Sequence, residues 1–422
     1  MSTAIIITIC LLLLAAYAFD ISSPLTKIPS VILLLGLGWG LHRGTDWLET
    51  DLPNLEGTLP VLGTIGLILI VLEGSLDLDL DRSKLKMVRK ASLLAFVPML
   101  LLASGLAVVV TMVSGASFLD ALTNAIPLAV ISSAIAIPTA QAFKGPEREF
   151  VIYESSLSDI AGVLAFNFVA LNEAFELKTF GAFGLQMLVI VVISFLATIA
   201  LAFLLSRIKH HVKFAPIVLL TILIYAIAKA YHLPGLILIL AFGMFLGNLD
   251  RFTRFQWIRK LRPEILEMEV KKLKELVMEG AFLIRALFFL VFGYYIKTED
   301  VLDPVSLVWA LGICAAIYGL RALWLWGSGL RLMPLLFIAP RGLITVLLFL
   351  SIPASRSLPM FGPSLIIQVV LISSLMMMFG TMFSKSKSPK TAEVEAENQE
   401  VFPARLSDLG LADPSSHEGK EI

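Results

Sequence analysis

Charged residues are scarce in this chain of 422 residues, since Asp, Glu, Lys and Arg together make up only 16% of it. A soluble domain carries about a quarter. Hydrophobic residues reach 58% and the mean hydropathy is +0.88, which is more apolar material than a globular core accounts for. Acidic and basic residues balance at 33 each, so the net charge makes no strong case for nucleic acid or another polyanion as a partner. The composition therefore predicts an integral membrane protein.

Cysteine and histidine are also too few to build a metal centre or a disulfide framework. Cys10 and Cys314 each lie in an apolar run, far apart in the chain, where cysteine behaves as a small hydrophobe. The five histidines form no pair at metal-ligand spacing. We also find no nucleophile–base pair, so we expect neither a cofactor nor an enzyme.

Thirteen segments are apolar enough for a spanning helix, which needs about 20 residues. They lie near residues 3–19, 28–44, 58–76, 91–114, 119–142, 149–171, 181–206, 213–231, 234–249, 275–296, 304–325, 331–352 and 363–383. The first lacks the basic start and the cleavage site of a signal peptide, so we interpret it as a span. We predict an all-α transmembrane domain over residues 1–383 and a polar, disordered cytoplasmic tail over 384–422.

The loops between the spans predict an orientation. Lys and Arg gather in alternate loops, at 81–90, 144–149, 207–213 and 250–274, whereas the loops at 45–57 and 298–304 are acidic. The positive-inside rule then places the N-terminus outside and the C-terminus in the cytoplasm of a bacterial inner membrane. Residues 258–277 are amphipathic, and we interpret them either as a helix that lies along the cytoplasmic membrane surface and leads into the tenth span or as a solvated linker helix.

Ionisable residues within spans are costly and mark functional sites. Five stand out in this chain: Glu73, Glu154, Asp159, Arg285 and Arg341. Glu154 and Asp159 share the sixth span but point about 140° apart around a helix, so they cannot form one carboxylate pair. Asp159 lies about one and a half turns deeper. It either carries ions or merely fixes helix packing through an ion pair or hydrogen bond.

A buried carboxylate can carry two different ions. Ionised, Asp159 is a hard oxygen ligand for a small monovalent cation; protonated, it is neutral and cheaper to bury. Proton and cation then compete for one group, which gives obligatory exchange if the empty site does not reorient. Ser158 and Ser133 are candidate oxygen ligands beside it. Neutralising one charge with either ion predicts electroneutral, one-for-one exchange.

The other charged residues have two interpretations each. If Arg341 is buried it needs an anion or several carbonyls, and Glu154 is the best candidate partner; otherwise Arg341 snorkels to the surface. Glu73, at the end of the third span, either contributes to cation and proton binding or is an interfacial acid. Arg285 either pairs with Glu73 or snorkels.

Two spans are predicted to be interrupted. Pro138 in the fifth span follows Ser132 and Ser133, and Pro340 and Gly342 flank Arg341 in the twelfth span. These positions are seven spans apart, and an odd separation implies opposite orientation. The pattern predicts inverted repeats whose broken helices cross at the substrate site; two ordinary proline kinks are the alternative.

At this point the residues resemble a known family. Residues 154–159, Glu-Ser-Ser-Leu-Ser-Asp, look like the Glu-Ser-x-x-Asn-Asp motif of monovalent cation/proton antiporters, in the branch of sodium/proton exchangers. Segments 63–76 and 282–293 are similar to the family's third and tenth spans, and 340–342 resembles its Arg-Gly segment. The resemblance covers about residues 20–383.

The resemblance implies a thirteen-span fold with a core domain, a dimerisation domain and alternating access by an elevator-like movement. It assigns Asp159 as the carrier of H⁺ and of Na⁺, K⁺ or Li⁺, and it assigns Glu154 and Arg341 to a structural ion pair. The chain departs from the family at Ser158, where the family has Asn, and at 136–138, which lacks the acid of Thr-Asp-Pro. These two departures leave the choice of cation open.

Other functions fit the sequence less well. A channel needs a selectivity-filter loop, such as a glycine-rich run, and we find none. A regulated potassium-efflux pathway would carry a nucleotide-binding domain, and the segment after residue 383 has no Gly-rich strand–helix pattern. An organic-ion transporter on a related inverted-repeat scaffold is a further alternative.

Overall fold

The computed structural model describes residues 2–26, 28–47, 56–78, 84–140, 143, 145–172, 177–207, 214–231, 233, 235–252 and 263–383. Within these ranges the regular elements are all helices, without a strand. The chain divides into two units, Met1–Thr381 and Met382–Ile422. The predicted tail 384–422 lies outside the described residues and stays a prediction.

Each of the thirteen predicted spans carries helix. Most are single helices: α1 (Ser2–Thr26), α2 (Ser30–Trp47), α3 (Leu59–Leu76), α4 (Leu85–Ser114), α7 (Pro146–Leu171), α8 (Leu177–Arg207), α9 (Phe214–Ala230), α13 (Pro263–Tyr294), α15 (Pro304–Gly327) and α17 (Pro363–Phe383). Three are in pieces: α5 (Phe118–Ala129) with α6 (Ser133–Ala140), α10 (Leu236–Gly247) with α11 (Leu249–Phe252), and η3 (Leu335–Phe337) with α16 (Leu343–Leu350). Among the described residues, seven helical segments are individually long and apolar enough to cross a membrane. The predicted all-α transmembrane fold is confirmed.

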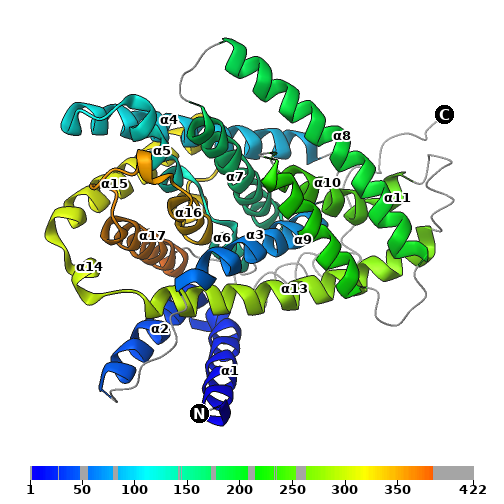
Figure 1. Cartoon of the computed structure of the whole chain (residues 1–422), viewed down its shortest axis with the longest axis horizontal. Coiled ribbons are helices and arrows are strands. Elements are labelled where there is room, and N and C mark those ends of the chain that lie inside the picture. Colours follow the sequence, from blue (N-terminus) through cyan, green and yellow to red (C-terminus); the bar gives the residue numbers. More distant parts are fainter. Residues whose placement is uncertain are drawn as a thin grey trace, which may run out of the picture. The chain divides into compact units, whose positions relative to one another are not determined.

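The helices form two groups that differ in their packing partners. In the α13 group, α13 packs on α2 and α3, α10 packs on α3 and α8, and α1 and α9 complete the set (Figure 1). In the α7 group, α7 packs on α4, α5 and α6, and α4 packs on α15. Helix α16 joins this group through α5, and α17 joins it through the hydroxyl of Tyr318, which donates to the carbonyl of Ser373 at 3.1 Å. The groups meet where α3 contacts α6, α7 and α16.

Helix α13 bears on the interpretation of residues 258–277. From Pro263 onward the amphipathic stretch continues without interruption into the tenth span, as the first interpretation expected, and it is not a separate linker helix. Its placement on the membrane surface stays a prediction. Residues 258–262 lie outside the described part of the chain. Leu266, Leu273 and Val277 are buried, and their helical spacing carries the same apolar face onward into the membrane-spanning part.

The fifth span is broken, but not where its proline suggested. Helix α5 ends at Ala129, Val130 is extended, and α6 begins at Ser133. Pro138 lies inside α6, where it removes only one backbone hydrogen bond. The break instead occurs where tertiary partners accept the freed amides: Ile131 N donates to Ser158 Oγ at 3.0 Å.

The second break lies directly against the first. The chain between η3 and α16 is not helical, and its Pro340 carbonyl accepts a hydrogen bond from Ser132 N at 2.9 Å. A Cβ at Gly342 would lie 2.5 Å from Ile135 Cδ1 and 3.1 Å from Ser132 Oγ, so a larger residue here would require these side chains to shift. The predicted crossing of two broken helices is therefore confirmed.

Candidate functional site

Asp159 lies at this crossing. Helix α7 carries it, and its side chain is only 1% exposed. Both the amide N (3.4 Å) and the hydroxyl of Ser133 donate to Asp159 Oδ2. Ser133 is the first residue of α6, so the carboxylate lies at the positive end of a helix dipole.

One of the two oxygens of the Asp159 carboxylate has no hydrogen-bond partner among the described residues. Within the described part of the chain, Asp159 Oδ1 has no hydrogen-bond partner, and neither do the buried hydroxyls of Ser132 and Ser156. Ser132 adjoins Ser133 at the break, and Ser156 lies three residues before Asp159, on the same side of α7. A buried oxygen without a partner is costly. The site therefore has oxygens without partners, which can bind a cation, and the carboxylate among them can also take up a proton.

Ser158, predicted as a cation ligand, has another task. Its hydroxyl oxygen accepts the Ile131 amide at the first break, so it stabilises the interrupted backbone. The sequence interpretation missed Ser156. Its spacing of three residues from Asp159 was the signal that could have indicated it.

Glu154 forms a buried ion pair, but its predicted partner, Arg341, is wrong. Its two carboxylate oxygens accept from Nη1 and Nη2 of Arg321 on α15, at 2.6 and 2.8 Å. Arg321 Nε also donates to the Leu335 carbonyl at 2.8 Å. This forked geometry satisfies both charges. Arg321 was not among the predicted buried charges, although it lies within the predicted eleventh span, 304–325, where its charge was the signal that could have indicated it.

Arg341 is buried, at 2% exposed, and it binds carbonyls instead of an acid. Its Nε donates to the Leu128 carbonyl at 2.7 Å, and its Nη1 donates to the Ala339 carbonyl at 3.1 Å. Leu128 is in the last turn of α5, so the guanidinium neutralises the negative end of that helix. The snorkelling interpretation is therefore wrong, and Arg341 joins the two breaks.

Glu73 and Arg285 belong to a different charge cluster, in the α13 group. Arg285 Nη2 lies 3.8 Å from Asp20 Oδ1, which also accepts from the Ser30 hydroxyl at 3.1 Å. Glu73 is half-buried and interacts electrostatically with Arg285 and Asp20. Among the described residues no hydrogen bond or ion pair joins Glu73 to Asp159, and the charges that act on Glu73 are those of Arg285, Asp77, Asp20 and Lys274. Asp20 was missed because the predicted first span ended at residue 19, whereas α1 continues to Thr26.

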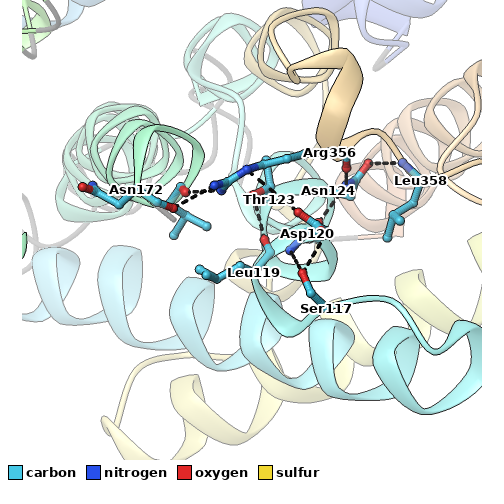
Figure 2. Close-up of polar contacts among 9 residues, drawn as sticks. Ser117, Leu119, Asp120, Thr123, Asn124, Asn172, Arg356 and Leu358 are labelled. Atoms are coloured by element: carbon cyan, nitrogen blue, oxygen red, sulfur yellow. Dashed lines mark hydrogen bonds and ion pairs between the residues drawn. The ribbon is translucent and has the colours of Figure 1, made fainter. Parts of the chain in front are cut away.

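A polar network joins the three helices of the α7 group that converge on the crossing (Figure 2). Arg356, at the end of the short 3-10 helix η4 (Ala354–Arg356) that follows α16, donates to the carbonyls of Val169 (2.6 Å) and Asn172 (2.9 Å) at the end of α7. Its Nε lies 3.9 Å from Asp120 in the first turn of α5. Asn124 Nδ2 donates to the Arg356 carbonyl at 2.7 Å. The network therefore ties α5, α7 and the end of α16 together.

We expect Arg356→Ala to lower the free energy of unfolding by about 2 kcal/mol, because it removes charge-assisted hydrogen bonds to carbonyls at the end of α7. Unfolding in detergent measures this. Arg331→Ala is the matched control: Arg331 is 86% exposed and lies 3.7 Å from Glu147, so its loss should cost less than about 1 kcal/mol. Equal effects of the two variants would contradict the structural role of the network.

Comparison with known proteins agrees with this architecture. The family described as "Sodium/hydrogen exchanger, transmembrane" matches residues 7–385. The sodium proton antiporter MjNhaP1 from Methanocaldococcus jannaschii at pH 8 has a similar structure, with a TM-score of 0.66 and 19% sequence identity over 90% of this chain and 98% of that one.

A structure of the same antiporter from electron microscopy gives a TM-score of 0.63 at 19% identity and covers 100% of both chains. Among curated proteins, none matches. At this identity the solved structures support the fold, whereas the family match extends over nearly the whole membrane part of the sequence. The chain is a multi-spanning membrane protein that belongs to the sodium/hydrogen exchanger family of cation/proton antiporters.

Proposed function

We propose that the chain exchanges protons for a monovalent cation, Na⁺ first and K⁺ or Li⁺ as the other candidates, through competition at Asp159. The observation that supports this most is the buried carboxylate with one oxygen held by Ser133 and the other left without a partner. An ionised carboxylate of this kind binds a small cation, and a protonated one holds the transported proton. The chain works as a carrier with no cofactor, and not as an enzyme.

Alternating access follows from the two helix groups. Asp159 lies in the α7 group, in which Arg341 and Arg356 hold the helices around the crossing together. The α13 group packs on it mainly through α3. Movement of the α7 group against the α13 group would open Asp159 to one side of the membrane at a time. Exchange is obligatory if the helices of the α7 group move only when Asp159 carries a proton or a cation.

Membrane placement is part of the same proposal. The chain lies in a bacterial inner membrane, with its N-terminus outside and its C-terminus in the cytoplasm, as the distribution of Lys and Arg in the loops predicts. It works as a homodimer in contact with membrane lipid and contributes to pH homeostasis. The second candidate function, a regulated potassium-efflux pathway or channel-like permease, differs in that it would not couple cation flux to protons.

Proteoliposomes with the full chain and an internal pH dye test the proposal. Adding NaCl outside, at equal pH on both sides, should alkalinise the lumen because Na⁺ entry drives protons out, and KCl and LiCl in parallel identify the cation. Because one charge replaces one charge at Asp159, we expect the rate to be insensitive to an imposed membrane voltage. A rate that follows the voltage would contradict one-for-one exchange, and cation flux without proton movement would favour the permease.

A further inference from the structure

A cavity of about 250 Å³ lies where the two helix groups face each other. Its wall comes from α7 and the end of α16 on one side and from α3 and α9 on the other. Polar side chains from both groups line it, namely Asn167, Ser351, Tyr225 and Lys229. It is large enough for several water molecules and has the polar partners that they need.

The cavity lies along the helix face that carries Asp159. Val163, Phe166, Asn167 and Ala170 line it, and they follow Asp159 by 4, 7, 8 and 11 positions, which is the spacing of one face of an α-helix. Val163 is about 6 Å further along the helix axis than Asp159. The cavity therefore ends about one helical turn from the carboxylate, and we name it the vestibule.

Lys229 brings a positive charge to this vestibule. It lies in the last turn of α9, its side chain is exposed, and no ion pair neutralises it within the described part of the chain. The described lining of the vestibule contains no acidic residue. A like charge in a narrow, low-dielectric opening lowers the local concentration of cations. The vestibule is thus an approach to a cation site that carries a cation-repelling group.

We propose that Lys229 sets the apparent affinity for the transported cation on the vestibule side by repelling it there and favouring its release. This inference rests on the proposed exchange function. Helix α7 begins within the basic segment 144–149, which the positive-inside rule assigns to the cytoplasm, so the far end of α7, and with it the vestibule, lies outside. Lys229 cannot change the final distribution of ions, which the two gradients determine; it changes only how much cation is needed on that side.

The test measures initial rates of ²²Na⁺ exchange for the full chain in right-side-out and everted membrane vesicles. In right-side-out vesicles we expect Lys229→Gln to lower the apparent KM for Na⁺ about 2- to 10-fold, the range of a like charge at roughly 10 Å in a partly aqueous site. Lys229→Glu should lower it further, and Lys229→Arg should leave it unchanged. Everted vesicles should show no change in KM.

Two controls separate charge from packing. Lys297→Gln removes an exposed lysine just before α14 (Thr298–Leu302), which does not line the vestibule, and should leave KM unchanged. Raising the ionic strength with choline chloride should shrink the difference between wild type and Lys229→Gln, because salt screens the charge. Equal KM values for wild type and Lys229→Gln, or equal changes in KM from Lys229→Gln and Lys229→Arg, would overturn this inference and leave the proposed function standing. Absence of Na⁺, K⁺ and Li⁺ exchange by the wild type would overturn the proposed function as well.

Discussion

Asp159→Asn should reduce cation/proton exchange to the background of empty vesicles, and Asp159→Ala should do the same. Asparagine keeps the size and one oxygen of the side chain, but it neither ionises nor takes up a proton. It therefore cannot alternate between the two loads that the proposed exchange requires. Fluorescence-quench exchange in everted vesicles measures the loss.

The fold should survive this change. Removing a buried ionisable group removes a desolvation cost, so the Asn variant should unfold no more readily than the wild type. Asp303→Asn is the matched control: Asp303 caps α15 by accepting the Ser306 amide at 3.0 Å, and asparagine caps a helix equally well. That variant should exchange normally. Full exchange by Asp159→Asn and Asp159→Ala would refute the assignment of the carrier.

Arg321→Ala should lower the free energy of unfolding by about 3–5 kcal/mol, because it leaves the carboxylate of Glu154 buried and unpaired. Both side chains are nearly inaccessible, at 6% for Arg321 and 2% for Glu154. The double variant Glu154→Leu/Arg321→Met removes both charges and should recover most of the loss. Denaturant unfolding in detergent, with a double-mutant cycle, measures the coupling.

A partly exposed ion pair with a similar N···O distance provides the control. Lys84 Nζ lies 2.9 Å from Glu149 Oε1, but the side chains are 27% and 40% exposed. Lys84→Ala should therefore cost no more than about 1 kcal/mol.

Charge swaps distinguish the two candidate partners of Glu154. The swap Glu154→Arg/Arg321→Glu should restore stability, and rescue by a swap with Arg341 instead would contradict the observed pairing.

The positions of the spans could be predicted because the membrane imposes a strong rule on local sequence. Each span needs a long apolar run, and each run is visible without knowledge of its neighbours. Asp159 could be predicted for the same reason, since an acid deep in a span is expensive wherever it points. The crossing of two broken helices followed from proline and glycine at positions related by an odd number of spans.

Pairings between spans could not be predicted in the same way. The partner of Glu154 depends on how α7 and α15 are rotated, and packing sets that rotation. The first break depends on Ser158 and Pro340 accepting the freed amides of Ile131 and Ser132, and these contacts join segments distant in the chain. Pro138 is a local signal, and it indicated the wrong position.

Proton release on cation binding tests the central claim most directly. Full-length protein in detergent and weak buffer, at a pH where Asp159 is protonated, is titrated with NaCl while a pH indicator reports free protons. Competition at one carboxylate predicts a saturating release that approaches one proton per chain, and no release by Asp159→Asn. Na⁺ binding without proton release, or undiminished release by Asp159→Asn, would contradict the claim that cation and proton share Asp159.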